Sequence, residues 1–211
     1  RRRAATRVSG PGRTADGHAV ALLVNLGGTR DIAGGVAAGA EGVGLLRTEV
    51  FFLDRRDAPS VEEQQERYAE VFTAFAGTKA VVRTLDAGAD KPLRFVDVPP
   101  EPNPALGIRG LRTARRHPEL LDGQLRAIAR AAAGSGADVW VMAPMVSTPA
   151  EAAAFAERAH GLGLPVAVAM IEVPAAALRA RDLLAVCDFA SLGTNDLAQY
   201  TFAADRMAGE L

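Results

Sequence analysis

The sequence contains a single cysteine, no excess of charge and no long hydrophobic run. Cys187 alone excludes an internal disulfide and a zinc site built from several cysteines, and it suits a reducing compartment. The 24 lysines and arginines balance 25 aspartates and glutamates to a net charge of −1, which gives no overall attraction for nucleic acid or a membrane surface. No apolar run approaches the ~20 residues that cross a bilayer, and no apolar segment of a signal peptide follows the arginines at positions 1–3. We therefore expect a cytoplasmic protein with no membrane insertion and no nucleic-acid partner.

The remaining composition is that of one globular domain preceded by a basic segment. With 211 residues, 49% of them hydrophobic, the chain can bury one sizeable core. Residues 1–17 hold five arginines and one aspartate without a hydrophobic period, and they predict a solvated linker or arm, although a basic arm could also bind anions. We expect the domain itself at residues 18–211. Because the sequence lacks an initiating Met and stops soon after a motif-rich stretch, we expect a piece of a longer protein.

Short apolar runs alternate with longer amphipathic segments after residue 19, as in repeated βα units around a mostly parallel sheet. Such α/β units build either an open doubly wound sheet or a (β/α)8 barrel of the TIM type, and periodicity alone does not choose between them. An eightfold barrel typically needs ~250 residues, so a barrel here would be incomplete, with about six βα units present and the last two missing. The six predicted strands are residues 20–25, 43–47, 80–85, 139–143, 166–171 and 189–192.

Two helix starts carry a clear local signal. Ser60 with Glu63, and Thr148 with Glu151, fit the capping box, in which a hydroxyl and a carboxylate satisfy each other's backbone amides. The prolines between residues 98 and 104 are too dense for a helix and predict a long loop. Further helices are predicted at 118–133 and, shorter, after residues 29 and 174.

Arginines follow two neighbouring strands of the predicted sheet. Arg47 ends the second strand and Arg83 lies at the end of the third. Because parallel α/β folds gather their sites at the carboxyl ends of the strands, these side chains should converge on one face. A guanidinium group binds phosphate or carboxylate oxygens with two parallel bonds, so the pair predicts an anionic substrate, and Arg109 and Arg206 could join it. For each arginine taken alone, a surface ion pair is the commoner role.

Two carboxylates end the next pair of strands. Glu172 follows the fifth strand, and Asn195 and Asp196 follow the sixth. Paired carboxylates can hold Mg²⁺ while substrate oxygens and water complete its octahedron, but they could equally form salt bridges with the arginines. His18, His117 and His160 show no paired spacing, so neither a histidine metal site nor a catalytic triad is indicated. We expect Cys187 to be a small core residue.

Five motifs, in order along the chain, resemble the phosphoenolpyruvate-binding barrel of the enzyme I family, the phosphoenolpyruvate-protein phosphotransferases of the bacterial sugar phosphotransferase system. The resemblance covers nearly all of residues 17–207. The motifs are Gly39-Ala-Glu-Gly-Val-Gly-Leu-Leu-Arg-Thr-Glu49, Arg83-Thr-Leu-Asp-Ala-Gly-Ala-Asp-Lys91, Asn103-Pro-Ala-Leu-Gly-Ile-Arg109, Met170-Ile-Glu-Val-Pro-Ala-Ala176 and Gly193-Thr-Asn-Asp-Leu-Ala-Gln-Tyr-Thr201.

The resemblance implies a role for each candidate residue. The family transfers the phosphoryl group of phosphoenolpyruvate to a histidine of its own N-terminal domain and then to a phosphocarrier protein for sugar uptake, and it releases pyruvate. A cysteine beyond the sixth strand donates the proton, and the family is dimeric through this domain. Carried over to this sequence, the substrate-binding residues are Arg47, Arg83, Arg109, Asn195, Asp196 and Arg206, and the Mg²⁺ ligands are Glu172 and Asp196.

Neither the acceptor histidine nor the proton-donor cysteine has a counterpart in this chain, so we expect no catalytic residue here and no turnover by the chain alone. Two related barrels, those of pyruvate phosphate dikinase and phosphoenolpyruvate synthase, are near alternatives. A carbon-carbon lyase on a similar barrel ranks below them. From another class, a non-catalytic dimerisation or regulatory module remains an alternative, although the intact set of candidate site residues argues against it.

Overall fold

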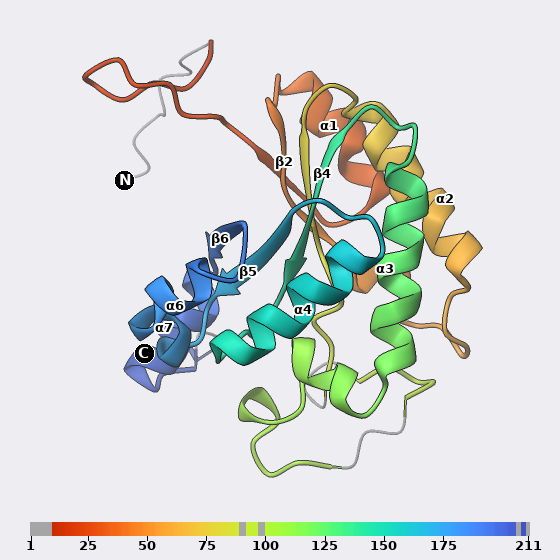
Figure 1. The fold of residues 1–211 in the computed structure, drawn as a ribbon, viewed down its shortest axis with the longest axis vertical. Helices are drawn as coiled ribbons and strands as arrows, with labels where there is room; N and C mark the ends of the chain where they lie inside the picture. The colour runs from red at the N-terminus through yellow and green to blue at the C-terminus, as the bar shows by residue number, and fades with distance from the viewer. Residues whose placement is uncertain (1–9, 89–91, 97–99, 206–207, 210–211) are drawn as a thin grey trace.

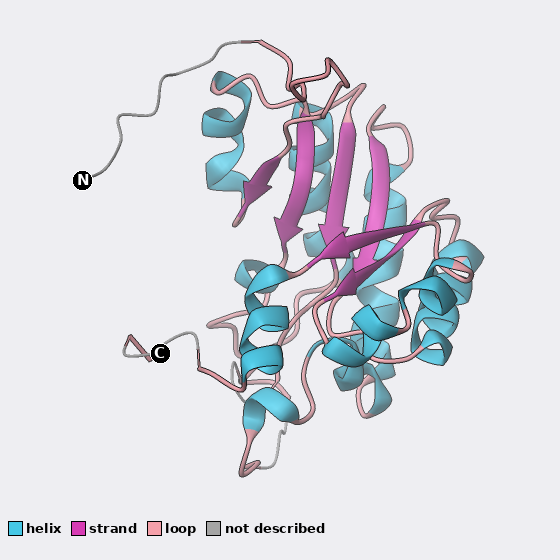
Figure 2. Cartoon of the chain, turned by 90° about the vertical axis from the view of Figure 1, so that its left-hand side faces the viewer, coloured by secondary structure: helices cyan, strands magenta, loops and turns pink. Residues whose placement is uncertain are grey.

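The computed structural model describes residues 10–88, 92–96, 100–205 and 208–209, and its centre is one parallel sheet. The sheet has six strands in the order β1-β2-β3-β4-β5-β6, each hydrogen-bonded in parallel to the next along the chain. Figures 1 and 2 show the strands curling into a half-barrel. A doubly wound sheet reverses its strand order at a switch point, whereas this order runs in one direction, so the fold is an incomplete α/β barrel. The strands are β1 (Val24–Leu26), β2 (Gly42–Arg47), β3 (Lys79–Arg83), β4 (Asp138–Ala143), β5 (Ala167–Ile171) and β6 (Phe189–Leu192).

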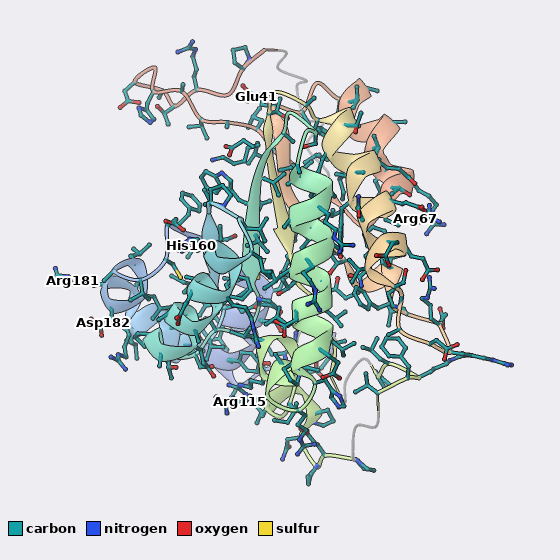
Figure 3. All side chains as sticks on the ribbon, turned by 45° about the vertical axis from the view of Figure 1, so that its right-hand side comes forward. Glu41, Arg67, Arg115, His160, Arg181 and Asp182 are labelled. Atoms are coloured by element: carbon teal, nitrogen blue, oxygen red, sulfur yellow. The ribbon has the colours of Figure 1, made fainter. Side chains whose placement is uncertain are left out.

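Helices connect the strands and cover the outer face of the sheet (Figure 1). They bury the main core between themselves and the strands, where residues such as Phe72, Leu125 and Val141 are fully enclosed. Charged side chains such as Arg67 lie on the outer surface (Figure 3). The helices are α1 (Ile32–Ala37), α2 (Val61–Ala74), α3 (Pro118–Ala132), α4 (Pro149–Gly161), α5 (Pro174–Leu178), α6 (Ala180–Leu184) and α7 (Thr194–Phe202). The 3₁₀ segments are η1 (Thr29–Asp31), η2 (Glu49–Phe51), η3 (Pro104–Leu106) and η4 (Gly110–Arg115).

Both predicted capping boxes are confirmed. The Ser60 hydroxyl accepts the Glu63 N–H at 3.1 Å, and the Glu63 carboxylate accepts the Ser60 N–H at 2.8 Å. Thr148 and Glu151 form the same pair at 3.2 and 3.0 Å. These reciprocal bonds fix where α2 and α4 begin, and so where each helix turns back along the sheet.

Two strand predictions were wrong in their bounds. The first strand begins at Val24, not at residue 20, because the Val20 N–H bonds to the Gly12 carbonyl and the Leu22 N–H to the Glu41 carboxylate instead of to a neighbouring strand. The third strand ends at Arg83, not at residue 85, because the Leu85 N–H bonds to a side chain of α3.

The N-terminal segment forms a small turn as far as it is described. Arg13 and Ala19 make an antiparallel bridge, and Figure 1 shows this turn projecting away from the sheet and helices. Residues 1–9 of the predicted arm, and residues 98–99 of the predicted proline-rich loop, lie outside the described residues. Residues 100–103 of that loop form no helix, and Pro104 begins the 3₁₀ segment η3. In the part of the chain that is described, no helix combines the length and apolar character needed to span a bilayer.

Candidate functional site

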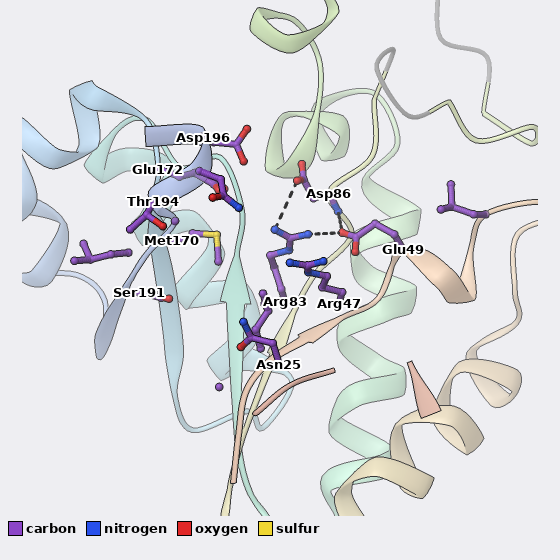
Figure 4. A pocket seen from close by; sticks show the side chains of 16 residues that line it. Asn25, Arg47, Glu49, Arg83, Asp86, Met170, Glu172, Ser191, Thr194 and Asp196 are labelled. Carbon is purple, nitrogen blue, oxygen red and sulfur yellow. Dashed lines mark hydrogen bonds and ion pairs between the residues drawn. The ribbon is translucent and has the colours of Figure 1, made fainter. Parts of the chain in front are cut away.

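A pocket of about 610 Å³ opens at the carboxyl ends of the strands. It collects side chains from five of the six strands or the loops that follow them, beginning with Asn25 on β1 and ending with Asp196 after β6 (Figure 4). Sequence separation within this set exceeds 170 residues, so only the curl of the sheet brings these groups together. Of the predicted site residues, Arg47, Arg83, Glu172, Asn195 and Asp196 line the pocket.

Arg47 and Arg83 lie side by side because they are register partners on β2 and β3. Arg47 is exposed to the pocket, whereas Arg83 is 9% exposed. Arg83 Nη2 donates to Glu49 Oε1 at 2.9 Å and Nη1 lies 3.7 Å from Asp86 Oδ2. Burial opposes the charge of Arg83, but Glu49, Asp86 and Glu172 outweigh it and raise its pKa above the usual value. The guanidinium group therefore stays positive inside the pocket wall.

One nitrogen of Arg83 is left without a hydrogen-bond partner. Its Nε is buried and has no acceptor among the residues that the structure describes. A buried donor without a partner costs free energy. Arg83 also lines the pocket, where its guanidinium group offers donors suited to an oxyanion.

The carboxylate pair is held by two backbone features. Glu172 Oε1 accepts the Met145 N–H at 2.7 Å, and Met145 adopts a left-handed φ of 57°. A side chain at Gly193 would place its Cβ 2.6 Å from Glu172 Cβ, so only glycine lets β6 approach this closely. Asp196 follows in the first turn of α7. The turn into α7 is thus built around the Glu172 side chain.

Burial, reinforced by the charges of Asp86 and Asp196, raises the pKa of Glu172 to about 7, despite the opposing hydrogen bond from Met145 and the charge of Arg83. The cluster of Glu49, Asp86, Glu172 and Asp196 contains more carboxylates than buried guanidinium groups, since Arg83 and Arg109 are the buried cations beside it. This imbalance would favour a bound divalent cation.

The donor set fits Mg²⁺. Within the described residues, no group of three or more acidic, histidine or cysteine side chains is arranged around a metal position. Mg²⁺ nevertheless needs only one or two carboxylates, because water and substrate oxygens fill its other positions. Glu172 and Asp196 supply two hard oxygen ligands at the pocket wall, and no protein nitrogen or sulfur ligand is required.

Arg109 lies behind the pocket wall and is 2% exposed. Its Nη2 and Nε donate to the two oxygens of Asp86 at 2.8 and 3.2 Å, and its Nη1 donates to Asp196 Oδ1 at 3.2 Å. It therefore ties the loop after β3 to the first turn of α7. Its contact with a substrate stays a prediction. Arg206 lies outside the described residues.

Sequence reasoning missed Glu49 as the partner of Arg83. Strand alternation could not have found it, because β2 ends at Arg47 and Glu49 begins the 3₁₀ segment η2. The three histidines line other parts of the surface, with His160 bonded to Asp188 and His117 to Glu119. Cys187 is buried in the main core, as expected, and burial together with Asp188 raises the pKa of its thiol.

Comparisons with known proteins show which family the chain resembles. A family model described as "PEP-utilising enzyme, PEP-binding domain" matches residues 1–211. A "Phosphoenolpyruvate-protein phosphotransferase" of Streptomyces coelicolor is 56% identical over 211 residues, covering 99% of this chain and 38% of that protein. One of the same name from Haloferax volcanii is 46% identical, covering 92% and 36%. A "Multiphosphoryl transfer protein" of Xanthomonas campestris is 41% identical, covering 100% and 26%. The chain thus spans about a quarter to two fifths of these relatives.

Proposed function

Because this chain belongs to the PEP-utilising enzymes and matches their PEP-binding domain along its length, we propose that it forms the substrate site of a phosphoenolpyruvate-protein phosphotransferase. The observation that carries this proposal is one pocket in which two guanidinium groups face two carboxylates. That set matches a small, multiply charged substrate bound together with a metal ion. The names of the relatives favour a phosphotransferase over a dikinase or synthase barrel.

In this proposal Arg47 and Arg83 bind the phosphoryl group of phosphoenolpyruvate. Arg83 is fixed by Glu49 and offers its guanidinium group to the phosphoryl oxygens, whereas the exposed Arg47 closes over the ligand from the neighbouring strand. Asn195 donates its side-chain amide from the first turn of α7, and Arg206 completes the set. Fixed positive groups around the transferring phosphoryl group stabilise the charge that spreads over its oxygens.

Glu172 and Asp196 would hold Mg²⁺, which when bound neutralises substrate oxygens and orients them for transfer. The chain's own contribution is to hold both carboxylates in place. The Met145 N–H orients Glu172, and Arg109 orients Asp196 through its Nη1. Asp86 fixes Arg109 in turn by two hydrogen bonds.

The chemical step breaks the bond between phosphorus and the enol oxygen and forms a bond to a histidine nitrogen, and the enolate takes up a proton to become pyruvate. No histidine lines the pocket among the residues that the structure describes, and Cys187 lies in the core. We therefore assign the acceptor histidine and the proton donor to other parts of the full-length protein. The chain alone should bind but not turn over phosphoenolpyruvate.

We extend the proposal to the setting of the activity. The acceptor histidine would pass the phosphoryl group to a phosphocarrier protein for sugar uptake, in the cytoplasm, and the barrel would form a homodimer. The name of the relatives from Streptomyces coelicolor and Haloferax volcanii supports phosphoryl transfer to a protein. The phosphocarrier protein, the cytoplasmic location and the homodimer rest on the family resemblance of the sequence motifs.

Calorimetric titration of the 211-residue chain with phosphoenolpyruvate, with and without Mg²⁺, tests the proposal. We expect binding that requires Mg²⁺ and that weakens at least roughly tenfold in Arg47→Ala, since a hydrogen bond between charged groups contributes about 1.5–3 kcal/mol. Arg126→Ala, which removes an exposed arginine from the outer helix α3, is the matched control and should bind as the original chain does. Absence of binding with Mg²⁺ would instead favour a non-catalytic module.

A further inference from the structure

Gln124 is a buried polar side chain in the middle of an apolar helix face. It lies on α3 between Leu121 and Ile128, one turn from each, and both of these pack in the main core. Gln124 itself is 1% exposed. An amide buried among apolar side chains costs free energy unless its hydrogen bonds are made, so its presence at this position calls for a specific set of partners.

Three of its four hydrogen-bonding positions are filled by protein. Gln124 Nε2 donates to Thr48 Oγ1 at 3.0 Å and to the Tyr68 hydroxyl at 2.9 Å. Gln124 Oε1 accepts the Leu85 N–H at 2.8 Å. Burial raises the pKa of Tyr68 above its usual value, so its hydroxyl stays neutral. One amide therefore joins α2, α3 and the loops after β2 and β3.

Two of the partners of Gln124, Thr48 and Leu85, are chain neighbours of residues that line the pocket. Thr48 lies between Arg47 and Glu49, and its hydroxyl donates to the Arg83 carbonyl at 2.9 Å. Leu85 precedes Asp86. Thr48 meets Gln124 through its hydroxyl and Leu85 through its backbone N–H, whereas their neighbours Arg47, Glu49 and Asp86 line the pocket.

A second set of hydrogen bonds joins the same two loops to each other on the pocket side. Glu49 Oε1 accepts both Arg83 Nη2 and the Asp86 N–H, each at 2.9 Å. The ends of β2 and β3 are thus joined on the inner face by Glu49 and on the outer face by Gln124. The inner bonds compete with any anionic ligand for Arg83, whereas the outer ones do not.

We propose that Gln124 is a positioning residue for the substrate site, which holds the ends of β2 and β3 so that Arg47 and Arg83 face one ligand. This rests on the proposed function for the identity of the ligand, but the positioning itself is a property of the chain without ligand. Gln124 touches neither the pocket nor a ligand, since the pocket lining does not include it.

Four variants separate a positioning role of Gln124 from a general contribution to stability. Gln124→Met keeps the length and volume of the side chain and removes every hydrogen bond. Tyr68→Phe is the matched control, because it removes one bond of the same buried amide on the side of α2 and leaves both loop contacts intact. Thr48→Val removes the hydroxyl that links Gln124 to the Arg83 carbonyl, and Thr48→Ser restores it.

Amide hydrogen exchange in the ligand-free chain is the first measurement. The reporter is the Asp86 N–H, which bonds to Glu49 on the pocket side and not to Gln124. We expect its exchange to accelerate roughly tenfold or more in Gln124→Met and Thr48→Val, and to stay within about twofold in Tyr68→Phe and Thr48→Ser. Unchanged exchange in Gln124→Met, or equal acceleration in Tyr68→Phe, overturns the proposal. If Gln124→Met does not fold, Gln124→Leu replaces it in both measurements, because it also removes every hydrogen bond of the amide and leaves the bond from Thr48 to the Arg83 carbonyl in place.

Calorimetry with phosphoenolpyruvate and saturating Mg²⁺ is the second measurement. We expect affinity to fall roughly tenfold in Gln124→Met and to stay within about twofold in Tyr68→Phe, because only the first frees the strand ends that carry the arginines. An unchanged affinity in Gln124→Met overturns the positioning role. A chain that binds no phosphoenolpyruvate at all refutes the proposed function, and the exchange measurement then still decides whether Gln124 positions these loops.

Discussion

Glu172 is a buried carboxylate whose ionised form is unfavourable in the folded chain. Burial raises its pKa to about 7 from the usual 4.5. Between these two pH values the folded chain holds a proton that the unfolded chain has released. The free energy of unfolding therefore falls as pH rises from about 4.5 to about 7, by an amount on the order of 3 kcal/mol. Site geometry is maintained here at the expense of stability.

Glu172→Gln should stabilise the metal-free chain at pH 8 and leave it almost unchanged at pH 4.5. Glutamine is isosteric, keeps an oxygen for the Met145 N–H and carries no charge to bury. Urea unfolding of both proteins across this pH range measures the difference, which should grow with pH up to about 7 and then level off. Addition of Mg²⁺ at pH 8 should raise the stability of the original chain only.

Glu157→Gln is the control for this comparison, because Glu157 is an exposed carboxylate on the outer helix α4. It should give no stability difference that depends on pH in the same way. If the stability gap between the original chain and Glu172→Gln were independent of pH, the raised pKa of Glu172 would be contradicted.

The sequence was sufficient to predict the pocket residues at strand ends. It was not sufficient to predict the hydrogen bonds that residues on loops form with distant parts of the chain. Arg47 and Glu172 could be placed because a strand fixes both the position and the direction of its last side chain. The bonds from Arg109 to Asp86 and Asp196 could not, since they join a loop to a helix 87 residues away through backbone turns with no period. Gln124 gave no signal either, because a glutamine on a helix is normally exposed.

Local hydrogen bonding decides where the helices begin and where the strands end. Capping boxes involve residues three apart, so the starts of α2 and α4 were readable from the sequence alone. The start of β1 and the end of β3 were not readable, because other partners take the backbone donors there. The Leu85 N–H bonds to Gln124, which is 39 positions away.

Thr148→Ala should lower the free energy of unfolding by about 1 kcal/mol, since the first turn of α4 loses the side-chain acceptor for the Glu151 N–H. Thr148→Ser keeps that acceptor and should stay within a few tenths of a kcal/mol of the original chain. Urea denaturation measures both. Equal losses in the two variants would show that Thr148 contributes through its methyl group and not through the cap.

The order of the strands sets the shape of the whole molecule and also leaves two edges. Each strand pairs with the next along the chain, so the sheet curls in one direction (Figure 2). Residues at or after the carboxyl ends of five strands line the pocket. Among the strands that the structure describes, β1 pairs only with β2, and β6 only with β5. Unpaired edges of this kind favour association with another chain.

The β6 edge should make the 211-residue chain self-associate as its concentration rises. Leu192 at this edge is 68% exposed, and Phe189 on the same strand is also exposed. Leu192→Lys should weaken association, because a charge at an exposed edge disfavours strand pairing between molecules. Leu106→Lys, at a position 63% exposed on η3, is the control and should associate as the original chain does. Sedimentation velocity over a range of concentrations measures all three. A chain that stays monomeric throughout, or one that associates equally well with Lys at position 192, would exclude the β6 edge as the contact and direct the search for a homodimer interface to the helical face.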